Sequence, residues 1–238
     1  MRLSGQASFA LFGGPRFLEA DFRDAPSNED ARAWLRRTPE WPDGRLALWG
    51  EAGRGKSHLL HIWAARHGAD ARLGADLSGL PDIPVAGLAL DDADRAEERS
   101  LLHLLNAARE SGAPILLVAR TPPARWSVCL PDLASRLHAM IAVPVGAPDD
   151  ALLGALLARS LADRQLRVPP PVQEWLVRRL PRSGAAVRDA VARLDAFALD
   201  QHRNITVPFA TQVLADMLGP DEIFGTERGP SRGGEAPW

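Results

Sequence analysis

Residues 50–57, Gly-Glu-Ala-Gly-Arg-Gly-Lys-Ser, constrain the fold most because they fit the pattern G-x-x-x-x-G-K-[ST]. The apolar residues 45–49 before them are typical of a short buried strand, and the apolar spacing of residues 57–66 predicts a helix. In this order the glycines turn backbone N–H groups inward, and the helix N-terminus adds its positive end. The segment therefore predicts a phosphate-binding loop in an α/β fold.

The side chains at the end of this loop supply its chemistry. Lys56 would reach the β- and γ-phosphates, and the Ser57 hydroxyl would bind Mg²⁺. The chain has 28 basic residues, and Lys56 is the one lysine among them. Coding bias explains the excess of arginine, so a position that stays lysine is expected to need lysine chemistry. The other predicted nucleotide-binding residues are Gly50, Gly53, Gly55 and His58.

Two consecutive acids follow a second apolar segment. Residues 85–90 predict a strand, and Asp91 and Asp92 come directly after it. In a phosphate-loop enzyme Asp91 would hold Mg²⁺, directly or through water, and Asp92 would orient the attacking water. The alternative is a polar strand end followed by a helix cap. The phosphate loop upstream favours the catalytic interpretation.

Apolar periodicity predicts the remaining elements. Further strands are expected within residues 71–77, 115–119 and 141–145, and helices over 28–37, 97–111 and 133–138. Strands that alternate with helices indicate a parallel sheet flanked by helices. After Pro148 the pattern is helical only, over residues 152–161, 172–180, 185–199 and 208–218.

These patterns divide the chain into four parts. Residues 1–20 predict a tether, residues 21–146 an α/β domain and residues 147–218 a small all-α lid domain. Residues 219–238 are rich in glycine, proline and charge, so we expect a disordered tail.

Composition excludes several classes of protein. The net charge of −2 and pI of about 6.3 argue against binding nucleic acid mainly through its phosphates. The single cysteine, Cys129, cannot form an intramolecular disulfide, which suits a reducing cytoplasm. No apolar run approaches the roughly 18 residues of a membrane span, and no secretory signal is evident. We expect a soluble cytoplasmic protein.

Several shorter segments resemble one family. Residues 22–28 (FRDAPSN), 121–123 (TPP), 134–137 (ASRL), 187–189 (VRD) and 202–206 (HRNIT) together resemble the AAA+ module of the bacterial replication initiator DnaA. The chain most resembles the short DnaA-related regulators called Hda, over roughly residues 6–218. The resemblance implies an AAA+ P-loop NTPase fold with a parallel sheet, a helical lid, and ADP or ATP with Mg²⁺ as ligands.

The resemblance also assigns roles to two arginines. Arg136 would be an arginine finger that acts on a nucleotide held by a neighbouring subunit, and Arg188 a sensor-2 residue that contacts the subunit's own nucleotide. The alternative for both is an ordinary surface arginine. Arg120 occupies the place before the sensor-1 loop where the family usually has an acidic residue, so this chain departs from the pattern there.

The N-terminal residues 6–12 (QASFALF) resemble the short motif by which proteins dock on the replicative sliding clamp. Gln6 would hydrogen-bond at the pocket edge, while Phe9, Leu11 and Phe12 would fill an apolar groove. The alternative is a strand that packs on the core. No helix-turn-helix domain fits within residues 219–238, so DNA contact is expected to be weak or indirect.

The leading hypothesis is therefore a regulator that binds an adenine nucleotide, docks on the sliding clamp and stimulates ATP hydrolysis by DnaA. Its own ATPase activity would be weak at most. A stand-alone AAA+ ATPase, such as a helicase loader or a clamp-associated motor, is the first alternative, and a non-catalytic adaptor is the second. AAA+ modules often self-associate through the finger face, so a homo-oligomer also stays open.

Overall fold

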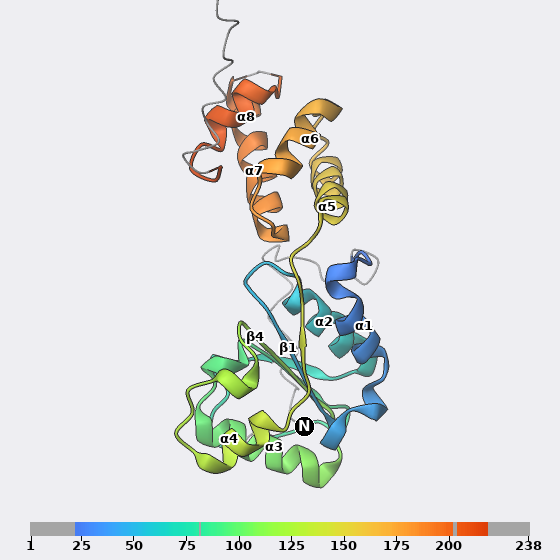
Figure 1. The fold of residues 1–238 in the computed structure, drawn as a ribbon, viewed down its shortest axis with the longest axis vertical. Helices are drawn as coiled ribbons and strands as arrows, with labels where there is room; N and C mark the ends of the chain where they lie inside the picture. The colour runs from blue at the N-terminus through green and yellow to red at the C-terminus, as the bar shows by residue number, and fades with distance from the viewer. Residues whose placement is uncertain (1–21, 81, 202–203, 219–238) are drawn as a thin grey trace, which may run out of the picture. The chain divides into compact units, whose positions relative to one another are not determined.

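The computed structural model describes residues 22–80, 82–201 and 204–218 of the chain (Figure 1). The chain divides into two compact units, Met1–Pro148 and Asp149–Trp238. The first is an α/β unit and the second is entirely helical in its described residues. The predicted clamp-binding residues Gln6, Phe9, Leu11 and Phe12, the tether and the tail lie outside the described residues, so their roles stay predictions.

The α/β unit is built on a five-stranded sheet in the order β2-β3-β4-β1-β5, with every pair parallel. The strands are β1 (Arg45–Trp49), β2 (Asp70–Leu73), β3 (Leu88–Asp91), β4 (Ile115–Ala119) and β5 (Ala142–Pro144). Every residue of β4 is buried, as expected for a central strand covered on both faces. The register pairs Trp49 with Ala119, so the strands end at one common edge.

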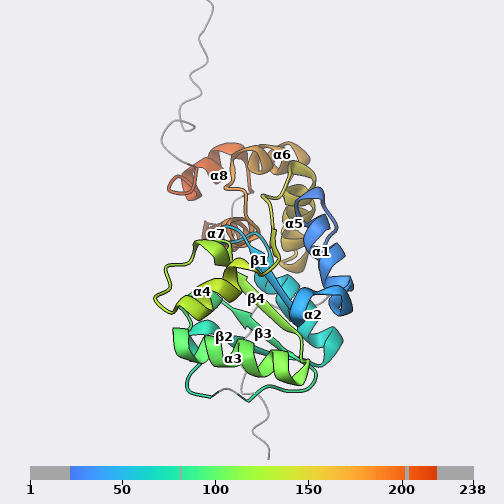
Figure 2. The ribbon, with the colours of Figure 1, turned by 60° about the horizontal axis from the view of Figure 1, so that its bottom comes forward.

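Helices cover both faces of the sheet. They are α1 (Glu29–Arg36), α2 (Lys56–His67), α3 (Glu98–Ser111) and α4 (Pro131–His138). Successive strand residues alternate between two apolar cores: Leu116 packs in the core that contains residues of α1 and α2, whereas Leu117 packs in the core that contains residues of α3 and α4. Figure 2 shows α3 and α4 side by side. The α/β unit therefore has the layered arrangement of a doubly covered parallel sheet.

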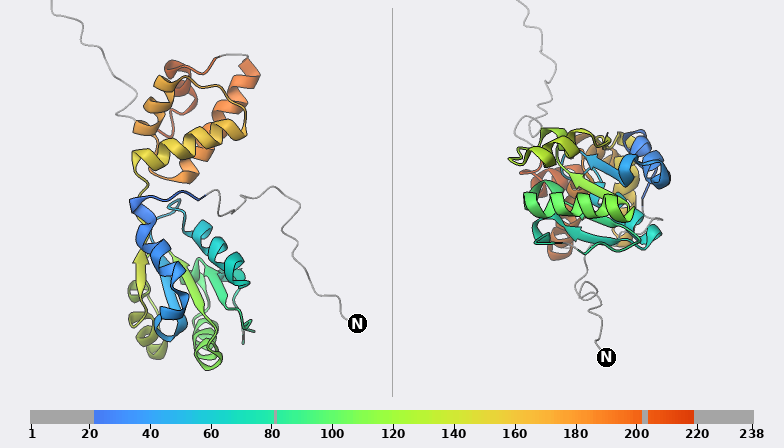
Figure 3. Two further views of the ribbon diagram at one scale, coloured as in Figure 1. Left: turned by 90° about the vertical axis from the view of Figure 1, so that its right-hand side faces the viewer. Right: turned by 90° about the horizontal axis from the view of Figure 1, so that it is seen from below.

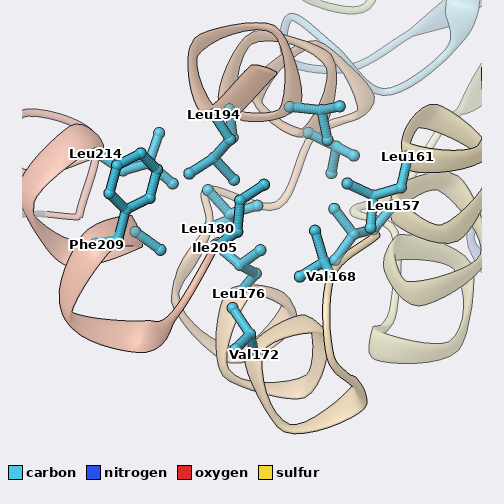
Figure 4. Close-up of a cluster of buried hydrophobic side chains, with 14 of the residues drawn as sticks. Leu157, Leu161, Val168, Val172, Leu176, Leu180, Leu194, Ile205, Phe209 and Leu214 are labelled. Atoms are coloured by element: carbon cyan, nitrogen blue, oxygen red, sulfur yellow. The ribbon is translucent and has the colours of Figure 1, made fainter. Parts of the chain in front are cut away.

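The helical unit, which we call the lid, consists of α5 (Asp150–Asp163), α6 (Pro170–Arg179), α7 (Gly184–Gln201) and α8 (Val207–Val213), drawn in yellow to red in Figure 3. Leucines such as Leu157, Leu176 and Leu194 meet Phe209 in one apolar cluster (Figure 4). Helix α5 begins at a polar cap, because the Asp149 side chain accepts a hydrogen bond from the Leu152 N–H at 2.8 Å. The lid is therefore held together by an apolar core.

Short 3₁₀ helices connect the longer elements of the α/β unit. They cover Pro26–Asn28, Thr38–Glu40, Pro42–Gly44, Gly74–Asp76, Ala93–Arg95 and Pro123–Arg125. Among the described residues, no helix has the length and apolar character that a membrane crossing requires.

The predicted fold class is confirmed, but the strand predicted over residues 85–90 is wrong at its start. Val85 is 93% exposed, and the chain turns there because the Gly87 N–H donates to the Pro84 carbonyl at 2.9 Å. Gly87 has φ +105°, so β3 begins only at Leu88. The last helix is also shorter than predicted, since α8 ends at Val213 rather than near residue 218.

Candidate nucleotide-binding site

The glycine-rich loop lies between β1 and α2, and its backbone explains why glycines are needed. Gly53 and Gly55 have φ of +78° and +92°, which side chains rarely tolerate. Gly50 has φ +152°, and a Cβ atom there would lie 2.5 Å from the carbonyl oxygen of Val145. Helix α2 begins at Lys56, immediately after Gly55. The loop therefore has the strand–turn–helix geometry that presents backbone N–H groups to phosphate.

The side chain of Lys56 is folded into this loop. Lys56 is only 8% exposed, and its Nζ donates to the carbonyl oxygen of Glu51 at 2.9 Å. Burial lowers the pKa of Lys56, the negative charges of Asp91 and Asp92 oppose this, and Arg120 adds to the lowering. Both acids and Arg120 therefore act electrostatically on Lys56.

Parallel strands explain why these residues meet. The loop follows β1, Arg120 follows β4, and Asp91 ends β3, and these three strands are neighbours in the sheet. Their carboxyl ends lie at one edge, which is where open α/β sheets bind ligands. Arg120 is exposed. The predicted loop, the acid pair and the unusual arginine thus lie at the same edge of the sheet.

The acid pair has a constrained backbone. The Asp91 Oδ1 atom accepts a hydrogen bond from the Asp92 N–H at 3.0 Å, and Asp92 has φ +47°. A Cβ atom on Gly74 would lie 2.2 Å from the Asp92 carbonyl oxygen. Gly74 therefore permits the close backbone approach behind the acids. Sequence reasoning missed this residue, since its only signal was a glycine after β2.

An aromatic side chain packs against the end of the loop. The ring of Phe22 meets the ring of His58 edge-on, with centroids 5.1 Å apart. The Phe22 ring also lies 3.4 Å from where a Gly55 Cβ would be. Residues 22–28 are held nearby, because the Gly146 N–H donates to the Ser27 carbonyl at 2.8 Å. The segment that resembles part of the DnaA module thus reaches the phosphate loop through Phe22.

The residues predicted to hold Mg²⁺ suit that ion. Ser57 is half-buried in the first turn of α2, and Asp91 is half-buried at the end of β3. Mg²⁺ is usually held by one or two protein oxygens together with phosphate oxygens and water. The Ser57 hydroxyl and the Asp91 carboxylate would supply these protein oxygens. Within residues 22–80, 82–201 and 204–218, no group of three or more His, Cys, Asp or Glu side chains could hold a metal ion.

His61, one turn further along α2, is half-buried. Burial lowers its pKa, the charge of Asp91 opposes this, and His58 adds to the lowering.

The two predicted arginine sites lie on different units. Arg136 is half-buried on α4 of the α/β unit, and its Nε donates to Asn106 Oδ1 on α3 at 2.9 Å. Arg188 is exposed on α7 of the lid. The structure therefore brings the loop residues and the acid pair to one edge, whereas the position of Arg136 depends on its contact with α3.

Solved structures share this fold. Domain III of the Thermotoga maritima replication initiation protein DnaA is 17% identical, with a TM-score of 0.72 over 87% of this chain and 99% of that one. AMPPCP-bound DnaA from Aquifex aeolicus is 16% identical, with a TM-score of 0.60 over 79% of this chain and 67% of that one. The Thermotoga maritima RuvB Holliday junction branch migration motor is 18% identical, with a TM-score of 0.64 over 83% and 72%.

The parallel sheet with its glycine-rich loop, followed by a helical lid, gives the chain the fold of the AAA+ proteins DnaA and RuvB. A family model then narrows the class, because residues 149–214 match the model described as the Hda lid domain. The lid thus matches the Hda family, and the fold of the whole chain matches that of DnaA domain III. The resemblance inferred from short segments of the sequence is thereby confirmed.

Proposed function

We propose that this chain is a regulator of replication initiation that binds an adenine nucleotide, docks on the sliding clamp and stimulates ATP hydrolysis by DnaA. The observation that carries the proposal is the combination of an Hda-type lid, residues 149–214, with a phosphate loop whose buried Lys56 interacts with Asp91 and Asp92. The first feature supports the family's role, and the second supports nucleotide binding.

The nucleotide would bind at the phosphate loop, with Lys56 on the phosphates and Ser57 and Asp91 on Mg²⁺. The similar DnaA from Aquifex aeolicus was solved with AMPPCP, which supports an adenine nucleotide here. By resemblance to Hda the working ligand is ADP. Gly50, Gly53, Gly55 and His58 complete the proposed site, and Arg188 is the lid residue assigned to phosphate.

The stimulated reaction would take place in the partner. Arg136 would approach the ATP held by DnaA and stabilise the negative charge that develops as the γ-phosphate leaves. This chain therefore activates hydrolysis without consuming its own nucleotide. Docking on the clamp through Gln6, Phe9, Leu11 and Phe12 would concentrate the protein at newly replicated DNA. DNA contact would then be indirect, and the activity cytoplasmic.

The test measures hydrolysis by ATP-loaded DnaA in the presence of DNA-loaded clamp and the purified chain. Arg136→Ala should reduce the stimulated rate by about 1,000-fold or more, since arginine fingers contribute about 10³–10⁵. Arg109→Ala, which removes an exposed arginine of α3, is the matched control and should stimulate normally. ADP binding and clamp binding should be unchanged in both variants. Normal stimulation by Arg136→Ala would contradict the finger and favour an adaptor role.

A stand-alone ATPase remains a second candidate, because Lys56, Ser57, Asp91 and Asp92 include the residues that hydrolysis requires. It predicts appreciable turnover by the isolated chain that Lys56→Ala abolishes. Asp92→Asn should reduce that turnover as well, if Asp92 orients the water. Absence of turnover in the isolated chain, with stimulation of DnaA intact, would support the regulator instead.

A further inference from the structure

Helix α4 is anchored on α3 by apolar side chains. Leu133 and Leu137 of α4 are buried in the same core as Leu101 and Leu105 of α3. Leu133 and Leu137 are four residues apart, so they share one helix face. This packing determines which face of α4 is buried. It does not determine the conformation of Arg136, which precedes Leu137 and is half-buried.

A polar contact places the Arg136 side chain. Asn106 is half-buried on α3, and its Oδ1 accepts from Arg136 Nε at 2.9 Å. A guanidinium has five N–H donors, and this bond uses the single donor on Nε. Among the described residues, no ion pair reaches Arg136. The contact therefore holds the middle of the side chain and leaves its four Nη donors for another group.

A second contact from α3 fixes the start of α4. The Glu98 carboxylate accepts from the Cys129 N–H at 2.9 and 3.0 Å and from the Leu130 N–H at 3.0 Å. Leu130 is the residue that caps the N-terminus of α4. A carboxylate is favourable at the positive end of a helix. Glu98 and Asn106 thus attach α4 at its beginning and at Arg136.

We propose that Asn106 is a positioning residue that preorganises Arg136 for the ATP of a partner subunit, with Glu98 fixing the helix that carries it. This inference rests on the proposed function of Arg136. A side chain already held in place needs no reorganisation at the moment that negative charge develops on the γ-phosphate, so the contact affects the rate. The amide of Asn106 is neutral, so it holds the guanidinium without cancelling the positive charge that acts on the γ-phosphate. A carboxylate at this position would form an ion pair that competes with the phosphate.

A double-mutant cycle on DnaA stimulation tests this inference with the full chain, DNA-loaded clamp and ATP-loaded DnaA. Asn106→Ala should lower the maximal stimulated rate about tenfold, the effect of losing one hydrogen bond to a charged group. The concentration for half-maximal stimulation should stay the same. In the Arg136→Ala background, Asn106→Ala should have no further effect, because the residue it positions is absent. His103→Ala, an exposed α3 position, is the control and should be silent.

A second variant covers the case in which Asn106→Ala folds poorly. Asn106→Asp keeps the acceptor and the size, so its melting temperature should match that of the wild type. Its stimulated rate should still fall, because the new carboxylate forms an ion pair with Arg136 and offsets its positive charge. In both variants, the hydrogen-exchange rate of the Arg136 Nε–H, followed by NMR in the isolated chain, reports the contact directly. It should rise in Asn106→Ala and stay slow in Asn106→Asp.

The outcomes distinguish failure of the proposed function from failure of the positioning role of Asn106. Normal stimulation by Arg136→Ala would overturn the proposed function and this inference with it. A strong loss with Arg136→Ala, together with normal stimulation by both Asn106 variants, would overturn the positioning role alone. A loss in Asn106→Ala that adds fully to that of Arg136→Ala would also overturn it, since that result indicates general damage to α4.

Discussion

The α/β unit and the lid differ in what they bury. Among the described residues of the α/β unit, five polar or charged residues are buried: Asn28, Thr38, Arg45, Lys56 and Ser100. Every buried side chain in the described residues of the lid is apolar, and the lid core consists mainly of leucine and valine. Burying a polar group costs free energy unless it is hydrogen-bonded. Of these five residues, Lys56 lies at the candidate site, and the hydroxyls of Thr38 and Ser100 form hydrogen bonds within the unit.

Backbone conformation shows the same contrast. In the α/β unit, Asp92 and the loop glycines adopt positive φ at the candidate site. In the described part of the lid, Gln165 is the residue with positive φ, in the turn after α5. Unfavourable backbone conformations persist where surrounding structure holds them, often at functional sites. The comparison indicates that the lid is specified mainly by apolar packing, whereas the α/β unit combines two apolar cores with a site whose backbone is constrained.

The largest effect that tests this contrast is expected in the lid core. Leu176→Ala removes a fully buried side chain of α6 and should lower the free energy of unfolding by about 2–5 kcal/mol. Glu174→Ala, an exposed position on the same helix, should change it by less than about 0.5 kcal/mol. Urea denaturation followed by circular dichroism measures both. Similar losses in the two variants would refute the view that packing specifies the lid.

A substitution at the charged residue Lys56 of the α/β unit should impair ligand binding without lowering stability. Lys56→Met should weaken ADP binding about 100-fold, through lost charged hydrogen bonds, as measured by calorimetry. The nucleotide-free variant should not be less stable, because burial lowers the pKa of Lys56 and so disfavours its charge in the folded state.

The lowered pKa of Lys56 also predicts how the stability of the folded chain depends on pH. Below pH 10.5 the unfolded lysine binds a proton more readily than the folded one, so this group makes stability rise as pH increases toward 10.5. Lys56→Met should remove that contribution. A nucleotide-free variant that melts well below the wild type at neutral pH would show that Lys56 stabilises the fold instead.

The smallest effects are expected from two glycines, and they should differ in sign. Gly154→Ala in α5 should stabilise the lid by about 0.5–1 kcal/mol, since the nearest atom to the new Cβ is a Val177 methyl at 3.8 Å. Gly74→Ala should destabilise the α/β unit by about 1–3 kcal/mol, because its Cβ would overlap the Asp92 carbonyl. Thermal unfolding measures the stability of both variants. A change in the same direction for both would contradict the contrast between the lid and the α/β unit.

The features that the sequence determined are local ones. The phosphate loop, strands β1 and β4 and helix α3 depend on glycine spacing and on apolar periodicity within a few residues. The boundary of β3 was missed because Val85 and Ala86 are apolar yet lie in a turn. Apolar character alone does not distinguish a strand from a turn that precedes glycine.

Tertiary structure alone decided which distant residues meet. Asn106 with Arg136, Gly74 with Asp92, and Phe22 with His58 are pairs separated by many residues, and no motif links them. Such contacts depend on how α3, the sheet and the lead-in segment pack, and that packing is a property of the whole unit. The sequence by itself therefore determined the loop and the fold class, whereas the surroundings of Asp92 and Arg136 emerged only once the chain was folded.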